Sequence, residues 1–441
     1  MKRVISSFFV FLTILLVGCN NKVETEMKSS FSKTVNIQEI PMDVALSTLS
    51  TFMERVYPSF TKAQLKDRIS SVDVIRRAHT LTKAGDILPD AYIVNFMNEE
   101  GFAVLGANTS IDPIIAVTET GNLSISEFND INVDDYFIYD DSGNLIKDFY
   151  CVDDDDYYSA RENIKKHYLI LTMIDNAIES VGGSTPIGPS VPLYYESDGY
   201  YLNTLWGQGD AGSSTGINRY CTYNNKTRIA GCSSVALAQI MAYIHAPSQL
   251  RINHTLIDWD GITSTDYFEE LDSSFKDQAG ILYAGIFHNI HKSIFNNATL
   301  ITPRQIQLLM ERLGFVNVER IAATSFTIEM KQVVSDMLRE KKPVFLSAIP
   351  KGISHWGGAH SWVVDGAMFS GETYLLHFNF GWSGTCNGYF STSCLNPTKA
   401  WVYDDPDEDN TNSYYDDDYS WHFRLIRYDF PLAEWKAALS F

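Results

Sequence analysis

Cys232 stands where a thiol can act as a nucleophile. It follows Gly231 and precedes a run of small and apolar residues, which predicts a helix over Cys232–Ile244. The unpaired N–H groups and the dipole at a helix N-terminus favour a thiolate over a thiol. The alternative, a small buried hydrophobe, does not need this position. The setting therefore predicts a nucleophilic cysteine.

A histidine and an asparagine follow far downstream. His360 precedes Ser-Trp-Val-Val, which predicts a strand, and follows small residues that would let a substrate backbone approach. It suits a general base that holds the thiolate as an ion pair and then protonates the leaving amine. His355 lacks the Val-Val-Asp-Gly that follows His360. With Asn379 later still, the order of the three residue types is that of papain-type cysteine peptidases.

The segments around these residues resemble the streptopain family of secreted bacterial cysteine peptidases. Ala230–Met241 is similar to the family's Thr-Gly-Cys-Val-Ala-Thr-Ala-x-Ala-Gln-Ile-Met, and Gly357–Gly366 to its Gly-His-Ala-x-Val-x-Asp-Gly. Phe378–Phe390 is similar to its Asn-Trp-Gly-Trp-Gly-Gly element. A single match of this kind is weak, whereas three in order at plausible spacing are specific.

The resemblance implies roles for the residues around the imidazole. Asn379 would hold the far nitrogen of His360 through its side-chain carbonyl oxygen. Trp382 would shield that hydrogen bond from water. An asparagine in an ordinary turn is the alternative, and Asp365 is a weaker substitute for the third member of the site.

The resemblance also implies an oxyanion hole. A glutamine side-chain amide beside the Cys232 backbone N–H would stabilise the tetrahedral intermediate. The position six residues before the cysteine holds Lys226, which has no amide. Gln208, in Leu-Trp-Gly-Gln, resembles the glutamine of relatives with longer insertions; a plain surface glutamine is the alternative.

The chain departs from the family pattern at three of these positions. Ser233 and Ser234 replace Val-Ala, and Phe380 replaces a tryptophan. None of these changes removes a reacting atom, so they leave the chemistry intact and bear on substrate preference.

Patterning and resemblance together predict an α+β fold, with a papain-like cysteine peptidase domain preceded by a small α+β prodomain. The 441 residues are enough for two or three domains. Gly, Pro and Ser are frequent just before the peptidase domain, which is typical of a linker and of a processing site. The expected segments are a lipoprotein signal peptide (1–19), a tether (20–36), an inhibitory prodomain (37–181), a linker and processing region (182–200) and the peptidase domain (201–441).

Periodicity places the remaining elements. Helices are expected over Ile40–Tyr57, Ser159–Val181, Asp277–Ile290, Thr302–Leu313 and Thr327–Glu340. Strands are expected over Tyr92–Phe96, Gly101–Gly106, Pro113–Val117, Val344–Ala348, Ser361–Val364, Thr373–Phe378 and Phe423–Phe430.

The N-terminus predicts export and a lipid anchor. Lys2 and Arg3 precede an apolar run that ends in Leu-Val-Gly-Cys19, which resembles a bacterial lipobox with a diacylated cysteine. An ordinary signal peptide is the alternative. We expect an extracytoplasmic protein that is anchored by lipid to the cell envelope, at the outer membrane or the cell surface. Processing could then release it from this anchor. The net charge of −20 disfavours nucleic acid and anionic membrane surfaces as partners.

The cysteines and the acidic runs predict no metal or other cofactor. Without Cys19, five cysteines remain, so at least one thiol stays free, and Cys386 and Cys394 could pair with each other or with Cys221. No Cys or His pair has zinc-ligand spacing. The acidic run over residues 404–418 lacks the Asp-x-Asp-x-Asp-Gly calcium pattern and favours a solvated loop.

The sequence therefore predicts a cysteine endopeptidase made as a zymogen, which hydrolyses proteins or peptides through a Cys232 thioester with His360 as general base and acid. Its own prodomain would be its intramolecular inhibitor. Two alternatives stay open. One is an inactive surface-binding lipoprotein on a peptidase scaffold; the other is an acyl transferase with the same Cys–His pair.

Overall fold

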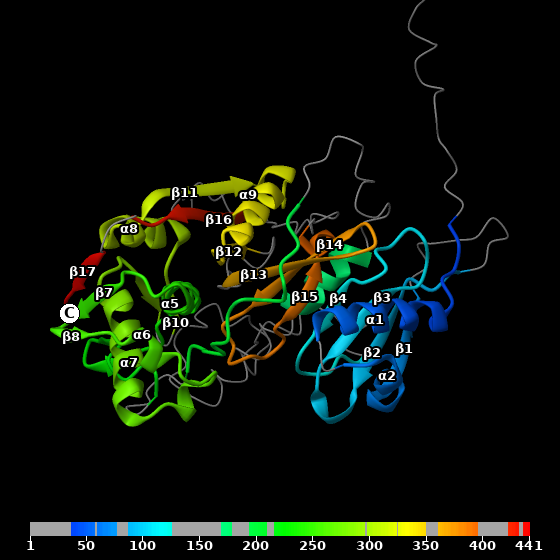
Figure 1. Cartoon of the computed structure of the whole chain (residues 1–441), viewed down its shortest axis with the longest axis horizontal. Helices are drawn as coiled ribbons and strands as arrows, with labels where there is room; N and C mark the ends of the chain where they lie inside the picture. The colour runs from blue at the N-terminus through cyan, green and yellow to red at the C-terminus, as the bar shows by residue number, and fades with distance from the viewer. Residues whose placement is uncertain are drawn as a thin grey trace, which may run out of the picture. The chain divides into compact units, whose positions relative to one another are not determined.

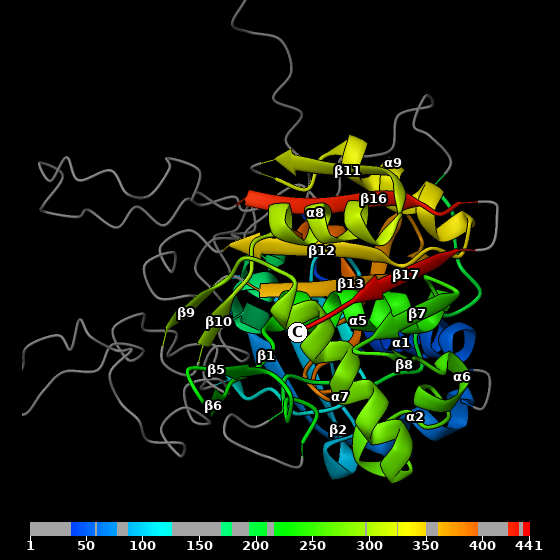
Figure 2. The same cartoon turned by 90° about the vertical axis from the view of Figure 1, so that its left-hand side faces the viewer.

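One antiparallel sheet of ten strands runs through the described chain. Its order is β1-β2-β3-β4-β15-β14-β13-β12-β16-β11. Figure 1 shows its first strands in blue and cyan beside the orange strands, and Figure 2 shows β13, β12, β16 and β11 side by side. The strands span Ile69–Ile75 (β1), Ala91–Phe96 (β2), Phe102–Gly106 (β3), Ala116–Thr118 (β4), Val316–Ala323 (β11), Val344–Ile349 (β12), His360–Ser370 (β13), Thr373–Asn379 (β14), Gly388–Ser391 (β15) and His422–Asp429 (β16).

The structure is a computed structural model. It describes residues 37–57, 60–76, 87–125, 169–178, 194–209, 216–295, 298–323, 325–349, 360–395, 422–431 and 435–441. Several predictions from the sequence lie outside these residues: the signal peptide with Cys19, most of the linker, His355 and the acidic run over 404–418. Residues 38–441 form one unit, so the boundary between prodomain and peptidase domain stays a prediction.

Two helices and the first four strands make up the N-terminal part. Helix α1 (Met42–Val56) has buried apolar residues at helical spacing, and α2 (Lys62–Arg68) follows with a capping box at Thr61. The buried face of α1 packs into a core with Val94 of β2, Leu105 of β3 and Val117 of β4. Because side chains alternate between the two faces of a strand, these three point to the same face of the sheet as the helix. The same core includes Met368, Leu375 and Tyr389 from strands of the expected peptidase domain, so both parts bury one shared apolar cluster.

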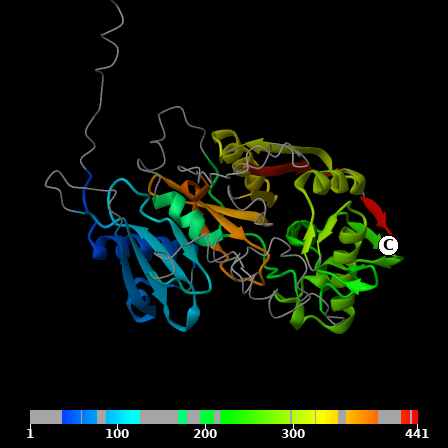
Figure 3. The same cartoon turned by 180° about the vertical axis from the view of Figure 1, so that it is seen from behind.

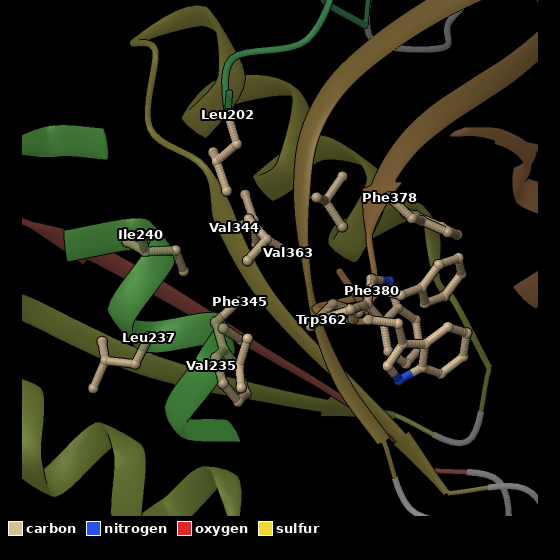
Figure 4. Close-up of a cluster of buried hydrophobic side chains, with 14 of the residues drawn as sticks. Leu202, Val235, Leu237, Ile240, Val344, Phe345, Trp362, Val363, Phe378 and Phe380 are labelled. Atoms are coloured by element: carbon tan, nitrogen blue, oxygen red, sulfur yellow. The ribbon is translucent and has the colours of Figure 1, made fainter. Parts of the chain in front are cut away.

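Helix α5 (Cys232–Ile244) lies against the C-terminal part of the sheet. Ten consecutive residues of α5, Ser233–Ala242, are buried, as expected of a helix enclosed on all sides. Figure 4 shows Val235 of this helix beside Phe345 of the sheet, while Trp362, Phe378 and Phe380 gather in an aromatic group. The other helices of this part are α6 (Trp259–Ile262), α7 (Ser273–His288), α8 (Pro303–Leu313) and α9 (Ile328–Arg339).

The two parts join edge to edge at β4 and β15. Gly388, Tyr389 and Phe390 pair with Thr118, Val117 and Ala116 in antiparallel register. Figure 3 shows the junction from behind, with the cyan strands beside the orange ones. Only glycine fits at position 388, because a Cβ atom there would lie 2.1 Å from the Val117 carbonyl oxygen. The junction is therefore part of the sheet itself.

The expected elements are largely confirmed. Each helix and strand predicted within the described residues is present, with ends that differ by a few residues. Strand β13 continues to Ser370, and β1, β11 and β15 were not predicted. Short strands also form outside the main sheet: Thr222–Tyr223 (β5), Lys226–Thr227 (β6), Gln249–Ile252 (β7), Thr255–Leu256 (β8), Ser293–Phe295 (β9), Ala298–Leu300 (β10) and Lys436–Leu439 (β17). Among the described helices, none is long and apolar enough to cross a membrane.

Candidate active site

Cys232 is the first residue of α5, as predicted. The residue before it, Gly231, has φ +88°, and a Cβ atom there would lie 2.8 Å from the Thr299 carbonyl oxygen. Only glycine combines this backbone conformation with so close a neighbour. The Cys232 thiol forms no disulfide with another described cysteine and is partly exposed, at the positive end of the helix. The chain therefore presents this thiol where a nucleophile needs to be.

His360 is the first residue of β13, the strand on which α5 packs. The start of α5 and the start of β13 are joined by the residues that follow Cys232 and His360. The hydroxyls of Ser233 and Ser361 lie 2.9 Å apart and are buried. Ser233 Oγ also donates to the Ile301 carbonyl oxygen at 2.8 Å. Ser233 was noted as a departure from the family pattern, and its hydroxyl here joins the helix of the thiol to the strand of the imidazole.

The His360 imidazole is held by the main chain of the loop after β14. Its Nε2 lies 2.8 Å from the Phe380 carbonyl oxygen, and a carbonyl can only accept, so Nε2 carries a proton. The Nδ1 atom of the neutral ring then has the lone pair that can take a proton from a thiol. Trp382 packs on the ring with centroids 4.6 Å apart and planes inclined by 30°. Trp382 thus covers the imidazole.

Asn379 lies beside this loop, but its carboxamide bonds elsewhere. Its Oδ1 accepts from Gln239 Nε2 at 3.2 Å and from Gly381 N at 3.1 Å, and its Nδ2 donates to the Thr204 carbonyl oxygen at 2.9 Å. This differs from the expected side-chain bond to the imidazole. The physical reason is that Oδ1 already accepts two N–H groups, while the next carbonyl in the chain, that of Phe380, points at His360.

Gln208 is brought to the start of α5 by an asparagine that the sequence did not single out. Asn218 is buried; its Nδ2 donates to the Gln208 carbonyl oxygen, and its Oδ1 accepts from Ala230 N at 3.0 Å. Gly207 also forms an antiparallel bridge with Trp382. Gln208 therefore lies on a segment tied both to the residue two before Cys232 and to the loop that covers His360. Its side-chain role in an oxyanion hole stays a prediction.

Asp365 belongs to another histidine. Its Oδ1 lies 2.6 Å from His377 Nδ1, and its Oδ2 accepts from Leu202 N at 2.9 Å. Both Asp365 and His377 are buried. The substitute role considered for Asp365 at His360 therefore finds no support in these bonds.

A carboxylate from the N-terminal part reaches the same histidine. Glu119 Oε1 lies 3.6 Å from His377 Nε2, an ion-pair distance longer than a hydrogen bond. Burial alone would lower the pKa of His377, but Asp365 and Glu119 outweigh it and raise this pKa to about 9. Burial would raise the pKa of Glu119, yet His377 and hydrogen bonds from Tyr57 and Tyr200 lower it. The junction therefore holds a charged carboxylate–imidazolium pair at neutral pH.

The other described cysteines do not compete for the nucleophile's role. Cys221, Cys386 and Cys394 form no disulfide with one another, so the pairings considered among them from the sequence are not made in the structure. Burial raises the pKa of the Cys221 and Cys394 thiols, which keeps them protonated. Within the described residues, no group of three or more His, Cys, Asp or Glu side chains is placed to hold a metal ion.

Sequence reasoning missed the residues that connect the segments of the site: Asn218, Gln239, His377 and Glu119. Only Gln239 had a usable signal, because it is the glutamine of the Ala-Gln-Ile-Met segment quoted for the family resemblance. The other three act through contacts between residues far apart in the sequence, which no local pattern reveals.

Comparison with known proteins agrees with this geometry. Residues 206–390, which contain Cys232, His360 and Asn379, match the model of the Peptidase C10 family. The structure resembles a fragment of prointerpain A from Prevotella intermedia, solved as a mutant with one cysteine replaced by alanine. The identity is 18%, the TM-score is 0.50, and the likeness covers 82% of this chain and 100% of that one.

Active wild-type interpain A from the same organism is 19% identical, with a TM-score of 0.40 over 53% of this chain and 94% of its own. No curated protein matches the chain. The prointerpain likeness shows a shared mixed helix-and-sheet fold. The match over residues 206–390 is to the model of the Peptidase C10 family, in agreement with the resemblance to streptopain-type cysteine peptidases found in the sequence.

Proposed function

We propose that this protein is a cysteine endopeptidase made as a zymogen, with Cys232 as nucleophile and His360 as general base and acid. The observation that carries the proposal is the 2.8 Å contact between His360 Nε2 and the Phe380 carbonyl oxygen. It fixes the tautomer that leaves the lone pair on Nδ1, at the start of the strand on which the helix of Cys232 packs.

The reaction follows from these groups. The thiol proton passes to His360, and the Cys232 sulfur attacks the peptide carbonyl carbon. The Cys232 backbone N–H and the Gln208 side-chain amide stabilise the resulting oxyanion. The imidazolium then gives its proton to the departing amine, which leaves a thioester. Water, deprotonated by the same imidazole, hydrolyses the thioester and restores the thiol.

The N-terminal part serves as the inhibitor in this proposal. Prointerpain A is a precursor by its name, and the likeness to its fragment covers 82% of this chain, more than residues 201–441 alone contain. Thr120, just after β4, bonds the loop that follows Trp382: its Oγ1 donates to the Gly384 carbonyl oxygen at 3.1 Å and accepts from Cys386 N at 3.0 Å. Residues of the prodomain thereby restrain the loop beside the imidazole.

We also propose that the protein is exported and anchored to the cell envelope by a lipid on Cys19. The lipobox-like segment before Cys19 supports this. Growth with a palmitate analogue should label the full-length protein, and Cys19→Ala should abolish the label and release the protein from the membrane fraction. Equal labelling of the two proteins would contradict the anchor.

The decisive experiment follows the intact mass of purified protein lacking residues 1–19, with Cys232→Ala in parallel. We expect only the protein with Cys232 intact to shorten to about 27–29 kDa, because cleavage in the Gly/Pro/Ser-rich linker leaves a fragment of that size. Only this protein should also hydrolyse casein. Wild-type protein that neither processes itself, nor cleaves casein after trypsin treatment, nor reacts with a thiol-directed peptidase inhibitor would refute the proposal. An amine added to the assay should not be incorporated into products; its incorporation would indicate an acyl transferase.

A further inference from the structure

Gln239 is a fully buried polar residue on the helix of the nucleophile. It lies seven residues after Cys232, about two helical turns along α5. A buried carboxamide is tolerated in a core only where its hydrogen bonds are made. Gln239 Oε1 accepts from Thr204 Oγ1 at 3.2 Å and from Trp206 N at 3.3 Å, and its Nε2 donates to Asn379 Oδ1 at 3.2 Å.

These bonds close a ring of three residues. Asn379 Nδ2 donates to the Thr204 carbonyl oxygen at 2.9 Å, so Thr204, Gln239 and Asn379 each bond the other two. All three are buried, with exposed fractions of 4%, 0% and 1%. Hydrogen bonds shielded from water in this way are strong and directional, and a buried ring that is fully satisfied fixes one arrangement. The ring therefore sets the spacing of three segments far apart in the sequence.

Each of these segments carries a group that the reaction uses. Helix α5 begins with Cys232, and the segment of Thr204 reaches Gln208 four residues later. Asn379 directly precedes Phe380, whose carbonyl oxygen holds His360 Nε2. The nucleophile, the expected oxyanion donor and the imidazole are thus all connected to one buried ring.

The loop after Asn379 lies so close to α5 that small changes in its position cannot be absorbed. Gly381 has φ +69°, and a Cβ atom there would lie 2.8 Å from Val235 Cγ1 on the helix. The Gly381 N–H donates to Asn379 Oδ1, the atom that also accepts from Gln239. The orientation of the Phe380 carbonyl between Asn379 and Gly381 therefore depends on where Asn379 is held.

We propose that Gln239 is a positioning residue of this peptidase: its carboxamide holds Asn379 and Trp206 so that the Phe380 carbonyl stays on His360 and Gln208 stays beside the start of α5. Asn379 then acts through the main chain of its neighbour. This inference rests on the proposed function of Cys232 and His360, and it assigns to Gln239 a role that touches no substrate.

Two substitutions at this position separate positioning from simple packing. Gln239→Met keeps the size of the side chain and removes all three hydrogen bonds. Gln239→Glu keeps the acceptor for Trp206 N, but when ionised it places an oxygen against Asn379 Oδ1. When protonated, the Glu hydroxyl can donate to Asn379 Oδ1 as the amide did. The matched control is Gln307→Met, another buried glutamine, which bonds Glu311 and the Val318 carbonyl on and beside α8.

We expect Gln239→Met to lower kcat roughly 10- to 100-fold with little change in KM, because displacement of reacting groups by about 1 Å costs this much. Gln307→Met should lower the melting temperature without changing kcat. The kcat of Gln239→Glu relative to wild type should rise as the pH falls and its carboxyl group becomes protonated, whereas the ratio for Gln239→Met should stay flat. Wild-type kcat in Gln239→Met, or a flat ratio for Gln239→Glu, would overturn the proposal.

The rate at which iodoacetamide alkylates Cys232, measured against pH in the full chain, distinguishes this inference from the proposed function. The positioning role predicts that Gln239→Met shifts the alkylation profile and Gln307→Met does not, since only the former disturbs His360. A wild-type protein without peptidase activity would refute the proposed function, while the alkylation profiles would still decide for or against the positioning role. An unshifted profile in Gln239→Met would refute that role.

Discussion

The ion pair between Glu119 and His377 gives a quantitative prediction for how firmly the prodomain is docked. Glu119→Gln keeps the shape of the side chain and removes its charge. At 3.6 Å and an effective dielectric constant of about 20, the Coulomb attraction of the pair is about 4.6 kcal/mol. The free energy of docking lost in the variant is smaller than this attraction, because Asp365 still neutralises His377 and the Glu119 side chain is 21% exposed.

We therefore expect Glu119→Gln to weaken docking by about 1–2 kcal/mol, between the values for surface and buried pairs. That loss corresponds to roughly a 5- to 30-fold change in the docking equilibrium. Hydrogen–deuterium exchange of the full chain in a Cys232→Ala background measures it, because this background prevents self-processing. Amides of β4 and β15 should exchange faster by about this factor if they exchange by undocking.

The matched control is Glu100→Gln. Glu100 pairs with Arg68 at 3.5 Å inside the N-terminal part, where both side chains are about half exposed. The same charge is removed, but no bond across the β4–β15 junction is lost. Equal exchange at the junction in the Glu119 and Glu100 variants would refute the reasoning.

Three more predictions test the junction and the site. First, the protection of β4 and β15 amides, corrected for the intrinsic exchange rate at each pH, should be greatest near neutral pH: stabilisation by His377, whose raised pKa is about 9, is complete below its ordinary 6.5 and lost as the pH rises through 9. Stabilisation by Glu119, whose pKa is lowered, is present above its ordinary 4.5 and lost only in stronger acid; a pH-independent rate of undocking would contradict both. Second, Ser233→Ala should cost about 1–2 kcal/mol in urea unfolding and reduce kcat, because it removes the hydroxyl contact between α5 and β13; unchanged kcat would separate that contact from catalysis. Third, Gly231→Ala should destabilise the fold by about 1–3 kcal/mol, since φ is +88° there; stability equal to wild type would exclude that strain.

The sequence was sufficient to predict elements with strong local patterns. Helix α5 spans Cys232–Ile244 as expected, because glycine starts it and apolar or small residues continue through it. Strand β13 was predicted too short. Asp365 and Gly366 look like the end of a strand, yet the Asp365 carboxylate is satisfied by His377 and Leu202 N inside the sheet. A buried charge with its partner elsewhere in the sequence cannot be recognised from local periodicity.

In the site, too, some residues could be predicted from local patterns and others could not. Cys232 and His360 could be singled out as candidates because their types, order and flanking residues are specific to a chemistry. The function expected of Asn379 could not be read from its type, since a carboxamide bonds whichever groups lie nearest. Here these are Gln239, Gly381 and Thr204, and the neighbouring main-chain carbonyl holds the imidazole.

The pairing of β4 with β15 has a consequence for the processed enzyme. While the chain is intact, β15 is an interior strand, bonded to β14 on one side and to β4 on the other. Removal of the proposed prodomain would turn β15 into a sheet edge with unpaired N–H and C=O groups, the kind of edge that recruits another extended chain. In the proposed zymogen, loss of the prodomain would therefore also create a new place where a strand can be added.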